Sequence, residues 1–199
     1  CGFGRTGNMW GSETFKIKPD IITAAKALSS AYLPISAVIL SKKVYEPIKS
    51  QANELGVFGH GYTYSAHPVC AAAALKSQQL MSERNIIGNV RKHSKLFNER
   101  IRNIMNDHWF FSNSRSVGLI GAIEFGYEGN RKFNAKIKIA AQCVKAIQKS
   151  GVILRALPGD IIGFCPPLII NQAQVNEMFD KINKAIKNFD EIAKDFREN

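Results

Sequence analysis

The feature that most constrains this chain of 199 residues is a run of apolar and small side chains that contains a single charge. The run from Ile21 to Leu28 reads IITAAKAL, and Lys26 is its only charged residue. A surface helix would place a lysine on a polar face, and this run has almost none. An ammonium held there without a partner loses solvation, which favours the neutral amine, a nucleophile toward carbonyl carbon. The alternative is a lysine that snorkels its head to water from a packed helix.

Several separated motifs surround this lysine. They are GFGRTG at 2–7, KPDI at 18–21, AAKALSS at 24–30, LPISAV at 33–38, HGYTYSAHP at 60–68, GVILR at 151–155 and FCPPLII at 164–170. In this order and spacing they closely resemble the class III aminotransferases that use pyridoxal phosphate (PLP), the ω-amino acid:pyruvate group in particular. The resemblance covers nearly the whole chain. It implies an α/β protein of PLP-dependent transferase fold type I.

The resemblance also implies a domain organisation. Members of that family are much longer chains, so we expect this sequence to be the C-terminal portion of such an enzyme. Residues 1–83 would be the end of the PLP-binding large domain. Residues 84–199 would be a linking helix followed by the small α+β domain.

The resemblance implies functional roles for three side chains. Lys26 would be the catalytic and cofactor-binding lysine that forms the Schiff base with PLP and moves the Cα proton of the substrate. Thr63 would donate its hydroxyl to the cofactor phosphate of the neighbouring subunit in a homodimer, the alternative being a turn hydroxyl that satisfies its own backbone. Arg155 would bind the substrate carboxylate through its planar fork, the alternative being a surface arginine at a strand end.

The implied reaction is transfer of an amino group from an amine or ω-amino acid to a keto acid such as pyruvate. By the resemblance, the aspartate that pairs with the pyridine nitrogen, the stacking aromatic and the main phosphate loop would precede Cys1. We therefore expect this chain to be incomplete as an enzyme by itself. The alternative is a non-catalytic remnant that folds or associates without turnover.

Composition excludes several other functions. The net charge of +11 gathers partly in 131–149, which has six basic and no acidic residues, but apolar residues recur there at helical spacing. Such a run is usually the solvated side of an amphipathic helix, and no nucleic-acid module accompanies it. The four cysteines lack paired spacing, which favours reduced thiols in the cytoplasm. The histidines show no metal-ligand spacing, and no apolar run is long enough to span a membrane.

The remaining pattern predicts the elements. GFGRTG matches a dinucleotide fingerprint, but no strand precedes it and no apolar-periodic helix follows, so we expect only a tight backbone path. We expect a short helix or helix-like turn at Lys26, a buried strand at 35–40 and a glycine-rich loop from 56 to Thr63. Further expected elements are helices at 44–55, 68–83, 86–105 and within 131–149, strands at 117–125, 152–156 and 161–165, and a final helix capped by Asn171 and Gln174.

Overall fold

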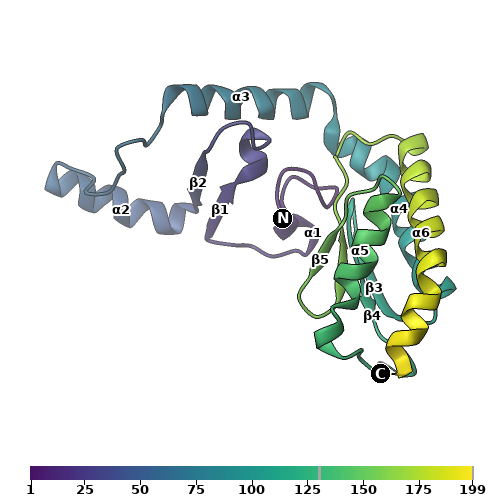
Figure 1. Cartoon of the computed structure of the whole chain (residues 1–199). Helices are drawn as coiled ribbons and strands as arrows, with labels where there is room; N and C mark the ends of the chain where they lie inside the picture. The colour runs from purple at the N-terminus through teal and green to yellow at the C-terminus, as the bar shows by residue number, and fades with distance from the viewer. Residues whose placement is uncertain (130, 199) are drawn as a thin grey trace. The chain divides into compact units, whose positions relative to one another are not determined.

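The computed structural model describes residues 1–129 and 131–198, and the chain forms two compact units (Figure 1). Unit 1 consists of Cys1–Gly4 and Asn8–Ile87, and unit 2 consists of Arg5–Gly7 and Gly88–Asn199. The chain therefore crosses between the units three times. The domain boundary that we expect between residues 83 and 84 stays a prediction.

Unit 1 is built on a pair of antiparallel strands, in which Ala24 faces Ala37. Its elements are α1 (Gly11–Thr14), β1 (Ile21–Ala25), the 3-10 helix η1 (Lys26–Ser29), β2 (Ser36–Leu40), α2 (Lys42–Leu55) and α3 (Pro68–Glu83). The helices expected at 44–55 and 68–83 are confirmed, and α3 starts at Pro68, where a proline needs no intrahelical hydrogen bond. The segment before Lys26 is a strand and not a helix, because β-branched residues at 21–23 suit a pleated strand.

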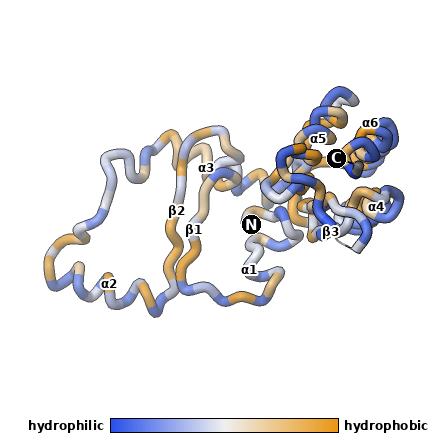
Figure 2. The backbone as a smooth tube through the Cα atoms, turned by 60° about the horizontal axis from the view of Figure 1, so that its bottom comes forward, coloured by the Kyte–Doolittle hydropathy of each residue, from blue (hydrophilic) through white to orange (hydrophobic). Residues whose placement is uncertain are grey.

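The prediction that 35–40 is a buried strand is half right. The strand β2 forms, but Val38 is 64% exposed and Ile39 is 43% exposed. Figure 2 shows that β1 and β2 are coloured hydrophobic along their length. A sheet of only two strands offers few neighbouring side chains that could cover these residues. The apolar composition of the run therefore did not predict their burial.

Unit 2 contains a four-stranded antiparallel sheet with strand order β3-β4-β6-β5. Its elements are α4 (Ile86–Asp107, which begins in unit 1), β3 (Phe111–Val117), β4 (Ile120–Phe125), η2 (Ala135–Ile137), α5 (Ile139–Lys149), β5 (Arg155–Leu157), β6 (Ile161–Phe164) and α6 (Gln172–Glu198). Strands joined by short turns and covered by helices are typical of an α+β domain.

The hydrophobic core of unit 2 joins the sheet to α4, α5 and α6. Phe97 of α4 and Phe164 of β6 both lie against Phe179 of α6, with ring centroids 5.7 and 6.2 Å apart. These side chains are at most 1% exposed. One face of α6 is apolar and lies in this core, where Val175, Phe179, Ile182, Ile186, Phe189 and Ala193 are all buried.

The start of α6 forms the predicted capping box. The Asn171 side chain accepts a hydrogen bond from the Gln174 N–H at 2.9 Å, and the Gln174 side chain accepts one from the Asn171 N–H at 3.0 Å. Two N–H groups that the helix leaves unpaired are thereby satisfied.

One strand of unit 2 was not predicted. β3 pairs with β4 across a turn at Gly118, whereas the sequence pattern indicated a single strand from 117 to 125. Gly118 has φ +58°, and an added Cβ would lie 2.4 Å from the carbonyl oxygen of Arg5. The turn therefore needs glycine both for its left-handed backbone and for the close approach of 5–7.

Candidate active site

Lys26 lies where β1 ends and η1 begins. Its φ of +54° is left-handed, which is uncommon for a residue with a side chain. Two further non-glycine residues of this turn, Ser30 and Ala31, have φ of +51° and +61°. Such conformations cost about 1–3 kcal/mol each and persist where the surroundings fix them. The backbone after Lys26 is thus held in an unfavourable path by its contacts.

Local hydrogen bonds account for part of this path. The Ala31 N–H donates to the Lys26 carbonyl at 2.8 Å, which closes the turn. Ser29, only 1% exposed, donates its hydroxyl to the Leu33 carbonyl at 2.6 Å. The serines in the motif AAKALSS therefore shape the turn.

An open cleft of about 700 Å³ adjoins Lys26 within unit 1. Its volume falls within the range of ligand sites. The lining comes from the N-terminal loop and from both strands: Cys1, Gly2, Phe3, Trp10, Ser12, Pro19, Ile21–Ala27 and Ser36–Val38. Phe3 and Trp10 contact each other there, with ring centroids 5.0 Å apart. The cleft joins an amine with hydroxyl groups and aromatic surface.

The Lys26 side chain is exposed, and no ion pair to it is found within 1–129 and 131–198. The prediction that this amine is shielded from water is therefore wrong for this chain. The reason is geometric: the lysine leaves at the end of a two-stranded sheet, where Ala25 already pairs with the first residue of β2. An unpaired amine beside a cleft is nevertheless accessible to a carbonyl compound.

Thr63 lies in the connection between α2 and α3, outside the lining of the Lys26 cleft. The whole stretch 56–67 is free of helix and strand, as the glycines predicted. The Tyr62 N–H donates to the Ser65 hydroxyl at 3.0 Å, so Ser65 satisfies the backbone of this turn. Thr63 is exposed, and its hydroxyl forms no hydrogen bond within the part of the chain described. This geometry leaves the Thr63 hydroxyl available to a ligand.

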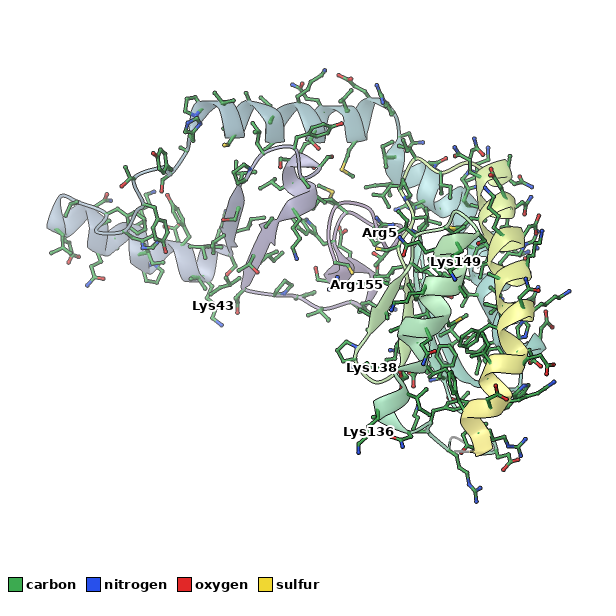
Figure 3. All side chains as sticks on the ribbon, in the orientation of Figure 1. Arg5, Lys43, Lys136, Lys138, Lys149 and Arg155 are labelled. Carbon is green, nitrogen blue, oxygen red and sulfur yellow. The ribbon has the colours of Figure 1, made fainter. Side chains whose placement is uncertain are left out.

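Arg155, labelled in Figure 3, is the first residue of β5, one of the two edge strands of the sheet in unit 2, and it pairs with Gly163. Its side chain is exposed. Among the described residues it has no acidic partner within ion-pair distance. The guanidinium is thus free to meet a carboxylate.

Sequence reasoning did not identify Arg5 as a structural residue. Its guanidinium donates to the carbonyl oxygens of Leu119, at 3.0 Å, and Pro166, and the Leu119 N–H donates to the Arg5 carbonyl at 3.0 Å. Burial lowers the pKa of Arg5, an effect that the nearby Cys165 partly opposes. Arg5 thereby holds the segment 5–7 against the rest of unit 2. Its place between the glycines of GFGRTG was the only local signal.

The same loop does not have the geometry of a dinucleotide site. Gly2 bridges to Trp10, and the helix that follows, α1, has only four residues. Gly4 and Gly7 have φ of +89° and +90°, which fits the expected tight backbone path.

The described residues contain no group of three or more potential metal ligands and no helix that is long and apolar enough to cross a membrane. All four cysteines are free. Burial raises the pKa of the Cys143 thiol to about 12, so this group stays protonated.

Comparison with known proteins gives one consistent family. The model of the family "Aminotransferase class-III" matches residues 1–186. An uncharacterized aminotransferase of Sinorhizobium fredii is 41% identical over 198 residues, which are 98% of this chain and 42% of that protein. The chloroplastic gamma aminobutyrate transaminase 3 of Solanum lycopersicum is 41% identical over 94% of this chain and 36% of that protein.

Solved structures agree with this match. An omega-transferase from Vibrio fluvialis superimposes with a TM-score of 0.90 at 34% identity, over 97% of this chain and 46% of that one. A PMP-bound aminotransferase from Vibrio fluvialis gives 0.89 at 33% identity, over 94% and 42%. The chain thus spans about two-fifths of the length of these relatives. The predicted fold, part of PLP-dependent transferase fold type I, is confirmed, and the chain belongs to the class III aminotransferase family.

Proposed function

We propose that this chain is part of a PLP-dependent aminotransferase that moves an amino group from an amine or ω-amino acid to a keto acid such as pyruvate. The observation that carries the proposal is Lys26, whose unpaired amine stands at the end of β1 beside a cleft of about 700 Å³. An amine at this position stands next to a space large enough for a small cofactor and substrate.

The residues of the cleft fit PLP, which when bound supplies an electron sink for the carbon that carries the amino group. Lys26 would hold the cofactor through its Nζ, because an amine reacts with an aldehyde. The hydroxyls of Thr23 and Ser36 and the ring of Trp10 offer polar and aromatic contacts around it. The Lys26 amine would also move the proton at the substrate Cα.

We propose that Thr63 serves the site of a second subunit in a homodimer. Support comes from its exposed hydroxyl and from its position outside the cleft of its own Lys26. A hydroxyl together with backbone N–H groups suits a phosphate oxygen, and the nearby Gly61 allows close approach. Sedimentation of an active species as a monomer would contradict this assignment.

Arg155 is the proposed substrate-binding residue. Its exposed guanidinium lacks an acidic partner in the described structure, so binding a carboxylate would break no existing ion pair. We also propose a cytoplasmic location, which the four free cysteines support.

The test is covalent trapping followed by turnover. PLP is added to the purified chain, the mixture is reduced with borohydride, and the modified lysines are identified by mass spectrometry. We expect Lys26 to be the preferred site and expect Lys26→Ala to remove it. Lys49→Ala, which changes an exposed lysine of α2, is the matched control and should leave the preference unchanged.

Alanine formation from pyruvate is then followed with a panel of amines and ω-amino acids, with and without the Lys26→Ala change. Lys26-dependent turnover supports the aminotransferase. Trapping at Lys26 without turnover under any donor is the result expected of a chain that is incomplete as an enzyme by itself. Labelling without a preference for Lys26 would refute the proposal that Lys26 holds the cofactor.

A further inference from the structure

The turn that follows Lys26 is held by two polar side chains of α3. The hydroxyls of Ser77 and Ser30 lie 2.7 Å apart. The amide of Gln78 donates to the Leu28 carbonyl at 2.8 Å and lies 3.5 Å from the Ala27 carbonyl. Residues about fifty positions apart in sequence are thereby joined at the one place where the lysine leaves the strand.

These contacts fall on the strained part of the backbone. Three non-glycine residues of the turn, Lys26, Ser30 and Ala31, have positive φ. Left-handed conformations of this kind persist only where the surrounding structure fixes them. Ser77 bonds to one of the three directly, and Gln78 bonds to the two carbonyls that lie between them. The contacts with α3 thus add to the hydrogen bonds within the turn that hold this backbone path.

The orientation of Gln78 is defined by its surroundings. Two carbonyl oxygens face its amide group, so the nitrogen must be the atom that points toward them. Its Oε1 is buried and has no hydrogen-bond partner among the described residues. An orphaned buried acceptor costs stability, and a helix that only needed an apolar contact here would be better served by leucine. The contribution of Gln78 therefore comes from its donor group, which faces two carbonyl oxygens.

We propose that Ser77 and Gln78 are positioning residues for Lys26: they fix the turn at Lys26–Ser30, and so the point and direction from which the amine enters the cleft. This rests on the proposed function for the role of the amine, but the fixing of the turn is independent of it. It adds to the aminotransferase site two residues that touch neither cofactor nor substrate. It also makes α3 the element that links the lysine turn to the Thr63 loop, since that loop leads into Pro68.

The first measurement uses no cofactor. Amide hydrogen exchange is followed in the whole chain for Ser30 and Ala31, whose N–H groups donate to the Ala27 and Lys26 carbonyls. We expect Gln78→Ala to reduce the protection of these amides roughly two- to tenfold, the range for loss of one hydrogen bond. The control is Gln79→Ala, the same substitution at the next, exposed position of α3. Amides of unit 2 report whether the variant folds.

A second variant guards against a general loss of packing. Gln78→Glu keeps the shape of the side chain and replaces the donor by a carboxylate oxygen that faces two carbonyls. It should reduce protection at least as strongly as Gln78→Ala. Ser77→Ala, compared with Ser82→Ala on the same helix, tests the serine pair in the same way.

The second measurement is the share of borohydride-trapped PLP that is found on Lys26, relative to the exposed Lys49. We expect this share to fall roughly two- to tenfold in Gln78→Ala and Gln78→Glu and to stay unchanged in Gln79→Ala. Unchanged protection in both Gln78 variants would overturn the proposal. So would lost protection with an unchanged Lys26 share, because the turn would then not direct the amine. A wild-type chain with no Lys26 preference would refute the proposed function instead, and the exchange data would still decide whether α3 fixes the turn.

Discussion

Replacement of Gly118 by alanine should destabilise unit 2 far more than an ordinary change at a left-handed glycine. The φ of +58° costs an alanine about 1–2 kcal/mol. The new Cβ would also lie 2.4 Å from the Arg5 carbonyl oxygen and 2.6 Å from two Thr6 backbone atoms, which cannot rotate away as a side chain can. Relief of such overpacking costs about 1–3 kcal/mol more.

A backbone shift at this point would also break the hydrogen bond from the Leu119 N–H to the Arg5 carbonyl, worth about 0.5–1.5 kcal/mol. Alanine also lowers the conformational entropy of the unfolded chain, which offsets about 0.4–1 kcal/mol of this loss in stability. The net expected loss in the free energy of unfolding is about 3–4 kcal/mol. Gly159→Ala is the matched control, because Gly159 has φ +83° but only a distant contact at 3.9 Å. It should cost about 1 kcal/mol.

The assay is urea unfolding followed by Trp109 fluorescence in a Trp10→Phe background, since Trp10 belongs to unit 1 and Trp109 to unit 2. The two glycine variants are compared with this background protein under identical conditions. Equal losses for Gly118→Ala and Gly159→Ala would refute the reasoning, because the close approach of 5–7 would then contribute nothing.

Four further outcomes are expected. Arg155→Ala should lower kcat/KM for a keto acid about ten- to a hundredfold, as expected for loss of a charge-assisted contact, and should spare a donor without a carboxylate; equal losses would indicate a structural role. Asn171→Ala should cost about 1 kcal/mol in urea unfolding through loss of the cap of α6, and an unchanged midpoint would count against that cap. Burial lowers the pKa of His108 from its ordinary 6.5, so the unfolded state binds more protons just below that value and stability should fall as pH drops through about 6.5; His108→Gln should flatten this slope in pH-dependent melts. Cys143, fully buried with a pKa raised to about 12, should react with a thiol reagent only after unfolding, whereas Cys165 should react at once.

The helices were predictable because their signals are local. The capping pair of α6 and Pro68 at the start of α3 lie within a turn of the ends that they define, and the apolar spacing of α6 repeats over many turns. Such patterns depend on little beyond the helix itself. The strands that form the sheet of unit 2 have weaker signals in the sequence.

β3 escaped prediction because its stabilisation is not local. Its sequence, FSNSRSV, is mostly polar, and the strand lies at the edge of the sheet, where alternate side chains face water. Pairing with β4 makes it a strand, and this pairing depends on the turn at Gly118. Polar edge strands of this kind resemble loops in sequence.

The site was predictable in its residues and not in its surroundings. A single lysine in an apolar run identified Lys26, and the short helix or helix-like turn expected there is η1, but the three β-branched residues that begin the run form a strand. The exposure of Lys26 and the support from Gln78 could not be read from sequence, since both depend on how α3 lies against the turn. Nothing in a single sequence pairs positions fifty residues apart.

The inclusion of Arg5–Gly7 in unit 2 has a consequence for the order of folding. Arg5 is synthesised 114 residues before Leu119 and 161 before Pro166, the two residues whose carbonyls receive its guanidinium. Closing so long a loop is slow relative to forming the local helices. These hydrogen bonds of Arg5 therefore cannot form until Leu119 and Pro166 have been synthesised. A piece of the chain that begins at residue 88 would lack residues 5 and 6, which lie against Gly118 in the β3–β4 turn.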